Sequence, residues 1–178
     1  MLHRPKAKWA AFTILEILAA AIIVAILAAL ILPNYRGILA KAQQAVCMAN
    51  MRGIQVGLAA YLQDNNDVWP QGPTPTEQGA WEAFWLATLK PHDISERTWQ
   101  CPTIKASLAA DGAKPATMPR VHYMPTMFDD TPGVARRWAT QPWLIERANA
   151  HGQGALISFP DGSIKSFNKV LAEQGISR

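Results

Sequence analysis

Few residues in this 178-residue chain have the types and spacings that perform chemistry. The sequence contains no G-x-S-x-G nucleophile elbow, no H-E-x-x-H zinc motif, no phosphate-binding loop and no dinucleotide fingerprint. His92, His122 and His151 are scattered, and no nucleophile pattern flanks them. The sequence therefore predicts that the protein is not an enzyme.

The two cysteines, Cys47 and Cys101, lie far apart and have no neighbouring cluster of histidines. Zinc ligands usually come in closely spaced pairs. We therefore predict that these cysteines form no zinc site, and that the protein holds no cofactor and no metal other than calcium.

Calcium has candidate ligands only among the carboxylates. Asp129-Asp130 is the acidic pair of an irregular segment, and Asp161 stands in a predicted turn. The run Asp64-Asn65-Asn66-Asp67 resembles a calcium-binding loop, but it lacks the D-x-[DN]-x-[DN]-G spacing. We interpret this run as the end of a helix.

Glu16 is the single charged residue in the apolar stretch 12–32. About 21 residues without a break are enough to cross a hydrocarbon core of ~30 Å as a helix. A helix that is apolar on every face belongs in a membrane or in the core of a filament. A carboxylate in such a helix costs about 2.5–3.5 kcal/mol at the membrane centre, which predicts a partner or a function. The alternative is that Glu16 only snorkels to the membrane face.

The residues before this stretch predict its orientation. Arg4, Lys6 and Lys8 are basic and no acid accompanies them, so the N-terminus is expected in the cytoplasm and the rest outside. A cleaved secretory signal peptide also starts with basic residues, but its apolar region is shorter, about 7–15 residues. Without the leader, the 17 basic residues fall to 14 against 13 acidic ones. This balance gives no indication of nucleic-acid binding.

The residues A-F-T-I-L-E at positions 11–16 follow a basic leader and open an apolar helix. This arrangement resembles the class III signal of type IV pilins and type II secretion pseudopilins. The resemblance implies that a prepilin peptidase cleaves between Ala11 and Phe12 and that the new amine of Phe12 is methylated. Glu16 is then the fifth residue of the mature chain, and Pro33 stands where the family often has proline. The family usually has glycine at the position of Ala11.

The resemblance also implies a role for the carboxylate of Glu16. After cleavage, the amine of Phe12 on a neighbouring subunit supplies a positive charge. Pairing with it would offset the desolvation of Glu16 and fix the register between adjacent helices.

Residues 33–63 are predicted to continue the helix as an amphipathic segment. A 4-3-4-3 spacing predicts one buried stripe formed by Cys47, Met51, Ile54, Leu58 and Tyr61/Leu62. Other residues, including Gln55, are expected on the remaining faces. Pro33, Gly37, Gly53 and Gly57 are weak points at which the helix could bend or melt. The following segment, from Tyr61 through Trp69-Pro70 to Thr76-Glu77-Gln78-Gly79, resembles that of major pseudopilins.

An exported domain with an even number of cysteines predicts a disulfide between Cys47 and Cys101. Two buried free thiols are the alternative. A loop of about 54 residues closed in this way stabilises the fold by roughly 4 kcal/mol in the entropy model.

The rest of residues 64–178 is predicted to form an α+β domain. Residues 76–89 form a helix capped by Thr76, whose aromatic face is core, or alternatively a carbohydrate platform. Residues 103–119 are predicted to be a surface loop, and 125–142 irregular. The predicted strands are 120–124, 143–147 and the hairpin 155–159/163–167, followed by a short helix at 168–174.

His151 is followed by nine residues and then Asp161-Gly162. This spacing resembles the H-x9-DG element near the C-terminus of prepilin-like proteins of the planctomycete and verrucomicrobial type. We expect Asp161-Gly162 to supply the hairpin turn and His151 to cap the hairpin or bond to it. The alternative is that His151 and Asp161 act together on a metal or a proton.

The sequence as a whole predicts an α+β, pilin-like fold. It has a leader at 1–11, a membrane or filament-core helix at 12–32, an amphipathic continuation at 33–63 and an external domain at 64–178. The resemblance implies a pseudopilin in the bacterial inner membrane with a periplasmic or extracellular domain. Its implied partners are copies of itself, other pseudopilins, the prepilin peptidase/methyltransferase and the assembly platform. A type IV pilin of a surface pilus and a signal-anchored envelope binding protein are the alternatives.

Overall fold

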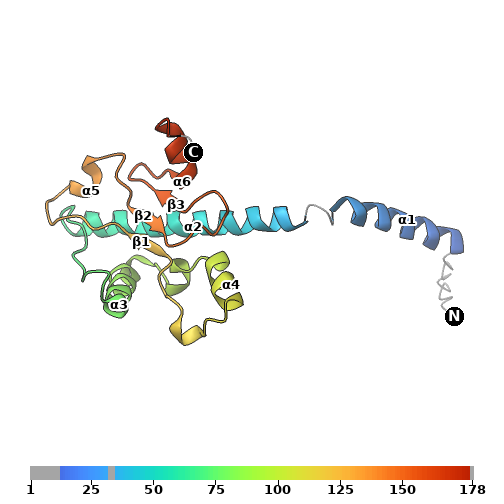
Figure 1. The fold of residues 1–178 in the computed structure, drawn as a ribbon, viewed down its shortest axis with the longest axis horizontal. Helices are drawn as coiled ribbons and strands as arrows, with labels where there is room; N and C mark the ends of the chain where they lie inside the picture. Colours follow the sequence, from blue (N-terminus) through green and yellow to red (C-terminus); the bar gives the residue numbers. More distant parts are fainter. Residues whose placement is uncertain (1–12, 32–34, 177–178) are drawn as a thin grey trace, which may run out of the picture. The chain divides into compact units, whose positions relative to one another are not determined.

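The computed structural model describes residues 13–31 and 35–176. The chain divides into two compact units, with the boundary between Leu39 and Ala40. The fold is α+β, as predicted, with an N-terminal apolar helix and a small antiparallel sheet (Figure 1). The leader 1–11, the predicted cleavage between Ala11 and Phe12, and Pro33 lie outside the described residues.

The first helix, α1, spans Ile14–Ile31 and contains Ala, Ile, Leu, Val and the one acid Glu16. Thr13 begins it: the Thr13 Oγ1 accepts a hydrogen bond from the Glu16 backbone N–H at 3.3 Å. The spacing T-x-x-E is that of a capping box, in which a hydroxyl satisfies a free amide of the first turn. By length and composition, α1 is able to cross a membrane.

The second helix, α2, spans Tyr35–Asp64 and has 30 residues, which corresponds to about 45 Å. Gly37, Gly53 and Gly57 all lie within it, and the chain stays helical through all three. The helix ends at the predicted place. Asn66 and Asp67 adopt φ values of 55° and 59°, in the left-handed region that polar residues tolerate best after glycine.

The third helix, α3, spans Gln78–Leu89, slightly shorter than predicted. Its N-cap position is Glu77 rather than Thr76, and no side chain caps it. Trp81 and Trp85 are each 1% exposed, so the aromatic face is core and not a carbohydrate platform. The chain then makes the short turns η2 (Lys90–His92) and η3 (Glu96–Trp99).

The prediction of a loop at 103–119 is wrong for its first half, because α4 spans Pro102–Ala110. Pro102 stands in the first turn, where its missing N–H has no cost, and Ile104 anchors the helix in the core. A short turn, η4 (Pro115–Thr117), follows. The predicted irregular segment 125–142 also contains one helical turn, α5 (Val134–Arg137).

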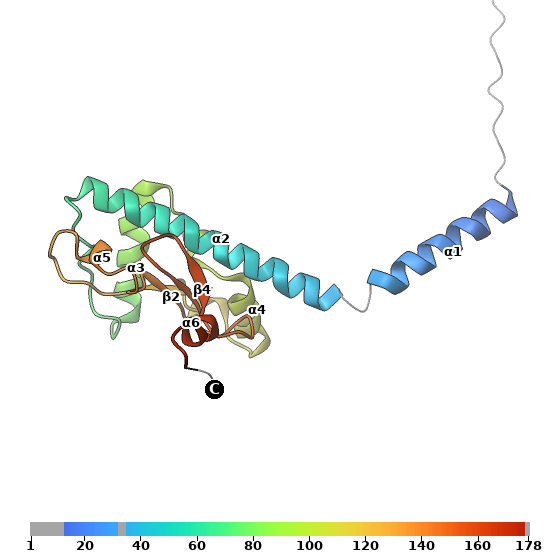
Figure 2. The same cartoon turned by 90° about the horizontal axis from the view of Figure 1, so that it is seen from above.

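The sheet is a four-stranded antiparallel meander in the order β1-β2-β3-β4. Its strands are β1 (Tyr123–Pro125), β2 (Leu144–Glu146), β3 (Leu156–Ser158) and β4 (Ile164–Ser166), and α6 (Phe167–Glu173) follows. The hairpin is confirmed, with Leu156 opposite Ser166 and Ser158 opposite Ile164. Figures 1 and 2 show the sheet lying alongside α2.

The core of the globular unit joins α2, α3 and the sheet. The predicted stripe of α2 is confirmed, since Cys47, Met51, Ile54 and Leu58 are all fully buried. Trp69 lies at its centre, with ring centroids 4.8 Å from Phe128 and 5.5 Å from Trp143. Such edge-on aromatic contacts add about 0.5–1.5 kcal/mol each beyond the area that they bury.

Candidate functional site

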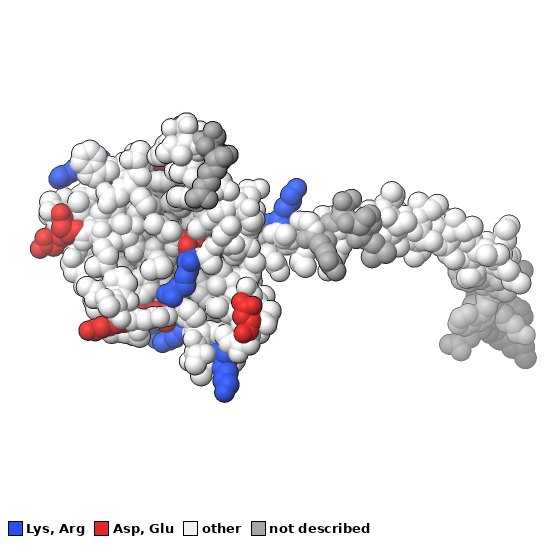
Figure 3. Space-filling view, in the orientation of Figure 1, with Lys and Arg blue, Asp and Glu red and all other residues white. Residues whose placement is uncertain are grey.

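The helix α1 presents a continuous apolar surface. No residue of α1 is buried, and its large apolar side chains are each between 53% and 82% exposed. Charged side chains gather on the globular unit, and the visible face of α1 carries none (Figure 3). A surface of this kind is stable only in lipid or against other apolar helices.

The carboxylate of Glu16 lies in the first turn of α1. The position is favourable for a negative charge because the helix dipole is positive at the N-terminus. Within the described residues, no Lys, Arg or His side chain forms an ion pair with Glu16.

A second apolar stripe lies on α2, away from the core. It consists of Ala42, Val46, Ala49 and Val56, in a 4-3-7 spacing that keeps them on one face. Val46 is 48% exposed and Val56 is 70% exposed, whereas the stripe headed by Cys47 is buried. The globular unit therefore covers only one side of α2.

The predicted disulfide is confirmed: Cys47 and Cys101 are bonded, with their Cα atoms 5.3 Å apart. Both are fully buried, and the bridge joins the middle of α2 to the residue before α4. The alternative of two free thiols is therefore wrong for this structure.

Two further side chains able to bind a metal, those of His151 and Glu146, lie next to this disulfide. The His151 Nε2 lies 3.8 Å from the Cys101 Sγ and 3.3 Å from the Glu146 Oε1. Cys47, Cys101, Glu146 and His151 each offer one ligand atom, and all four atoms lie within 4.8 Å of one another. No histidine lies near Cys47 or Cys101 in the sequence, but His151 lies next to Cys101 in space. The lack of a neighbouring histidine in the sequence was therefore the wrong reason for excluding a metal there.

Burial controls the charges in this cluster. The side chains of His151 and Glu146 are 3% and 0% exposed. Loss of solvation raises the pKa of Glu146 to about 7 and lowers the pKa of His151. Desolvation therefore opposes the ion pair that their 3.3 Å separation would otherwise allow, and it favours a neutral imidazole at neutral pH.

The sheet fixes the orientation of the Glu146 carboxylate. Glu146 ends β2 on the same inward face as Leu144, and its Oε2 accepts a hydrogen bond from the Leu156 backbone N–H at 3.2 Å. Its Oε1 is buried and has no hydrogen-bond partner among the described residues. One oxygen is thus held in place, and the other points at the cluster without a bond.

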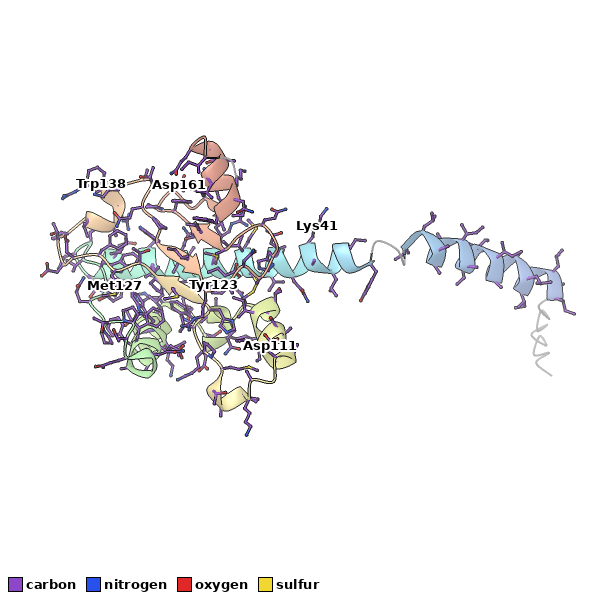
Figure 4. All side chains as sticks on the ribbon, in the orientation of Figure 1. Lys41, Asp111, Tyr123, Met127, Trp138 and Asp161 are labelled. Carbon is purple, nitrogen blue, oxygen red and sulfur yellow. A yellow bond between two sulfur atoms is a disulfide. The ribbon has the colours of Figure 1, made fainter. Side chains whose placement is uncertain are left out.

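His151 and Asp161 are not brought together in this cluster. The Asp161 Oδ1 accepts from the Ser163 backbone N–H at 2.8 Å, and Gly162 adopts a φ of +82°. These residues form the hairpin turn, as predicted, and Asp161 lies at the surface (Figure 4). His151 reaches the hairpin only indirectly, through Glu146 and its bond to Leu156.

The calcium candidates show no shared geometry. The Asp129 Oδ1 accepts from the Thr131 backbone N–H at 2.9 Å, a local turn contact, and Asp130 is exposed. Within residues 13–31 and 35–176, neither they nor Asp161 belong to a group of ligand atoms close enough to share an ion.

Sequence reasoning missed the buried polar residues. Glu146 is 2% exposed and Gln55 is 7% exposed, although Gln55 was expected away from the core. The alternation of residues 144–146 could have placed Glu146 inward with Leu144, because side chains two apart in a strand share a face. Nothing in the sequence signals its proximity to Cys101.

Comparison with protein-family models, curated proteins and solved structures finds no match to this chain. Functional inference therefore depends on the N-terminal residues and on the geometry described above.

Proposed function

We propose that the protein is a structural subunit of a helical envelope filament, a pseudopilin-like protein processed by a prepilin peptidase. The observation that carries this proposal is the state of α1: 18 residues, none of them buried, with a single acid in the first turn. A plain anchor has no need of that acid, whose removal would lower the cost of insertion.

In this proposal α1 has two successive environments. The helix is first stored in the inner membrane, with the globular domain on the periplasmic or extracellular side. It then leaves the lipid for a bundle of identical helices, where apolar side chains remain out of water. Because lipid and neighbouring helices are similarly apolar, the hydrophobic gain of the transfer is small. Packing and polar pairs must therefore provide the specificity.

Glu16 supplies such a polar pair. The amine created by cleavage before Phe12 is the proposed partner, contributed by an adjacent subunit. Removing one partner of a buried ion pair is strongly destabilising, about 3–5 kcal/mol, because the remaining charge is left uncompensated. The pair would thus select one register among the many that an all-apolar helix allows.

The exposed stripe of α2 supports the same proposal. Val46 and Val56 would contact a neighbouring subunit once α1 helices are bundled, and their exposure in the single chain is then explained. The proposed partners are further copies of this chain, other pseudopilins and the assembly platform in the inner membrane.

Replacement of Glu16 tests this function. In an expressing strain, Glu16→Leu should insert into the membrane normally but should not enter filaments recovered by shearing and pelleting. Leu15→Ile is the matched control on the neighbouring position and should assemble. Unchanged localisation and function of Glu16→Leu, with no filaments recovered from either protein, would instead favour a signal-anchored binding protein. Filaments on the cell surface would favour a type IV pilus.

A further inference from the structure

We propose that the protein, once its disulfide is reduced, binds one zinc ion through Cys47, Cys101, Glu146 and His151. This site lies wholly in the globular unit and is independent of the filament function. The disulfide and the zinc ion would be two mutually exclusive ways to close the same cross-link.

The chemistry of the four ligands fits zinc. Two thiolates, one imidazole and one carboxylate form a mixed sulfur, nitrogen and oxygen set. Zinc accepts all three atom types in a tetrahedron and has no preferred geometry of its own. Calcium and magnesium would instead require a set made of oxygen atoms.

The distances also fit. Metal–ligand bonds of about 2.0–2.3 Å give tetrahedron edges of roughly 3.4 Å between nitrogen and oxygen and roughly 3.5 Å between sulfur and nitrogen. The corresponding distances are 3.3 Å for His151 Nε2 to Glu146 Oε1 and 3.8 Å for Cys101 Sγ to His151 Nε2. Two of the six edges are therefore nearly formed, and the sulfurs must separate to roughly 3.8 Å when their bond breaks. The three remaining distances are each within 4.8 Å.

The unpartnered oxygen of Glu146 is the independent indication of a ligand. Its side chain is fully buried, and its Oε1 lies 3.3 Å from the His151 Nε2 but forms no hydrogen bond with any residue that the structure describes. A buried carboxylate oxygen without a partner is costly. The bond from the Leu156 N–H to Oε2 holds the carboxylate in place, as outer-shell contacts do around metal ligands.

Formation of the site requires reduction before binding. A dithiol reductant transfers two electrons and two protons to the disulfide, its own sulfurs join, and Cys47 and Cys101 become thiols. Zn²⁺ then displaces one proton from each thiol and the proton of Glu146 where its carboxyl is neutral, and these protons pass to solvent. The ion bonds to the two thiolate sulfurs, the Nε2 of neutral His151 and the Oε1 of Glu146.

The consequence is that α2 stays joined to the segment before α4 in both redox states. In an oxidising compartment the disulfide makes this link. In a reducing one, where thiols persist, zinc would make it.

The test uses the full-length protein in detergent, reduced with a dithiol and desalted without oxygen. Zn²⁺ alone is added, and binding is measured by competition with a chromogenic chelator. Co²⁺ then serves as a spectroscopic probe. We expect one equivalent of Zn²⁺ in the reduced protein and none in the oxidised protein. Bound Co²⁺ should show the visible absorption of a tetrahedral ion and thiolate-to-cobalt charge transfer.

Variants separate this site from unspecific thiol binding. Glu146→Gln and His151→Gln should each weaken zinc binding more than about 100-fold, because loss of an outer-shell contact alone costs about 10–100-fold. Asp161→Asn and His92→Gln are matched controls outside the cluster and should bind as the wild type does. Each variant is first checked in its oxidised form, where the disulfide supports the fold.

Each remaining outcome decides the question. Binding that also refolds a reduced, unfolded chain supports the site, since metal binding and folding are then coupled. No binding by the reduced protein overturns the proposal. Binding that is insensitive to both Glu146→Gln and His151→Gln, or that persists in the oxidised protein, also overturns it.

Discussion

The side chain of Gln55, in the middle of α2, donates a hydrogen bond of 2.6 Å to the backbone carbonyl of Phe159. Phe159 follows β3 at the start of the hairpin turn, so this bond ties the sheet to the long helix. Both residues are buried, and the contact spans 104 positions of the sequence.

Gln55→Leu should lower the free energy of unfolding by about 1–3 kcal/mol, because a buried carbonyl is left without a donor. Gln63→Leu is the control, since Gln63 is exposed near the end of the same helix. Urea denaturation of both variants measures the difference. Equal stability of the two variants would show that the Gln55 bond does not hold the sheet.

Gly57 allows α2 to approach the segment that follows α3. A Cβ built at Gly57 would lie 2.5 Å from the Ile94 Cγ1, whereas one at Gly37 has nothing within 4 Å. Gly57→Ala should therefore destabilise the protein by about 1–3 kcal/mol. Gly37→Ala should stabilise its helical turn by about 0.5–1 kcal/mol. Thermal unfolding of the two variants should shift in opposite directions, and a stabilising Gly57→Ala would refute the close packing.

His122 predicts a loss of stability in acid. Burial lowers the pKa of His122, whose Nδ1 accepts from the Cys101 N–H at 3.0 Å. The unfolded chain therefore binds more protons than the folded one once the pH falls below about 6.5. The free energy of unfolding consequently decreases as the pH falls further. Arg147 and Glu82 are the charged groups that also act on this imidazole, in opposite directions.

The measurement compares unfolding of the oxidised wild type and His122→Gln between pH 8 and pH 5 with chelator present. Glu146 has a raised pKa and opposes the trend, but it is common to both proteins. The wild type should lose more stability than His122→Gln on acidification. Equal losses would mean that the pKa of His122 is the same in the folded and the unfolded protein.

The sequence predicted those elements whose signals are local. The β hairpin follows from alternation around Asp161-Gly162, and the buried stripe of α2 follows from its 4-3 spacing. The disulfide was predicted from the even number of cysteines and from the expected export of the domain, not from geometry. These three features depend on neighbouring residues or on composition, and predicting them requires no knowledge of the fold.

The features that could not be predicted depend on tertiary contacts. Residues 102–110 lack a clear apolar period that would predict a helix. The helix α4 is stabilised by its one buried residue, Ile104, which packs in the core. Gln55 is polar in sequence but faces a carbonyl from the sheet. The meeting of Glu146 and His151 with Cys101 depends on the paths of β2 and the following loop, which no local pattern specifies.

The proposal that this chain is a processed filament subunit is tested most directly at its N-terminus. Mass spectrometry of the N-terminal peptide, from protein purified out of native membranes, reports both the cut and the modification. We predict a peptide that begins at Phe12 and carries an N-methyl group, despite Ala11 in place of the usual glycine. A peptide that still begins at Met1 would contradict it and leave α1 as an anchor.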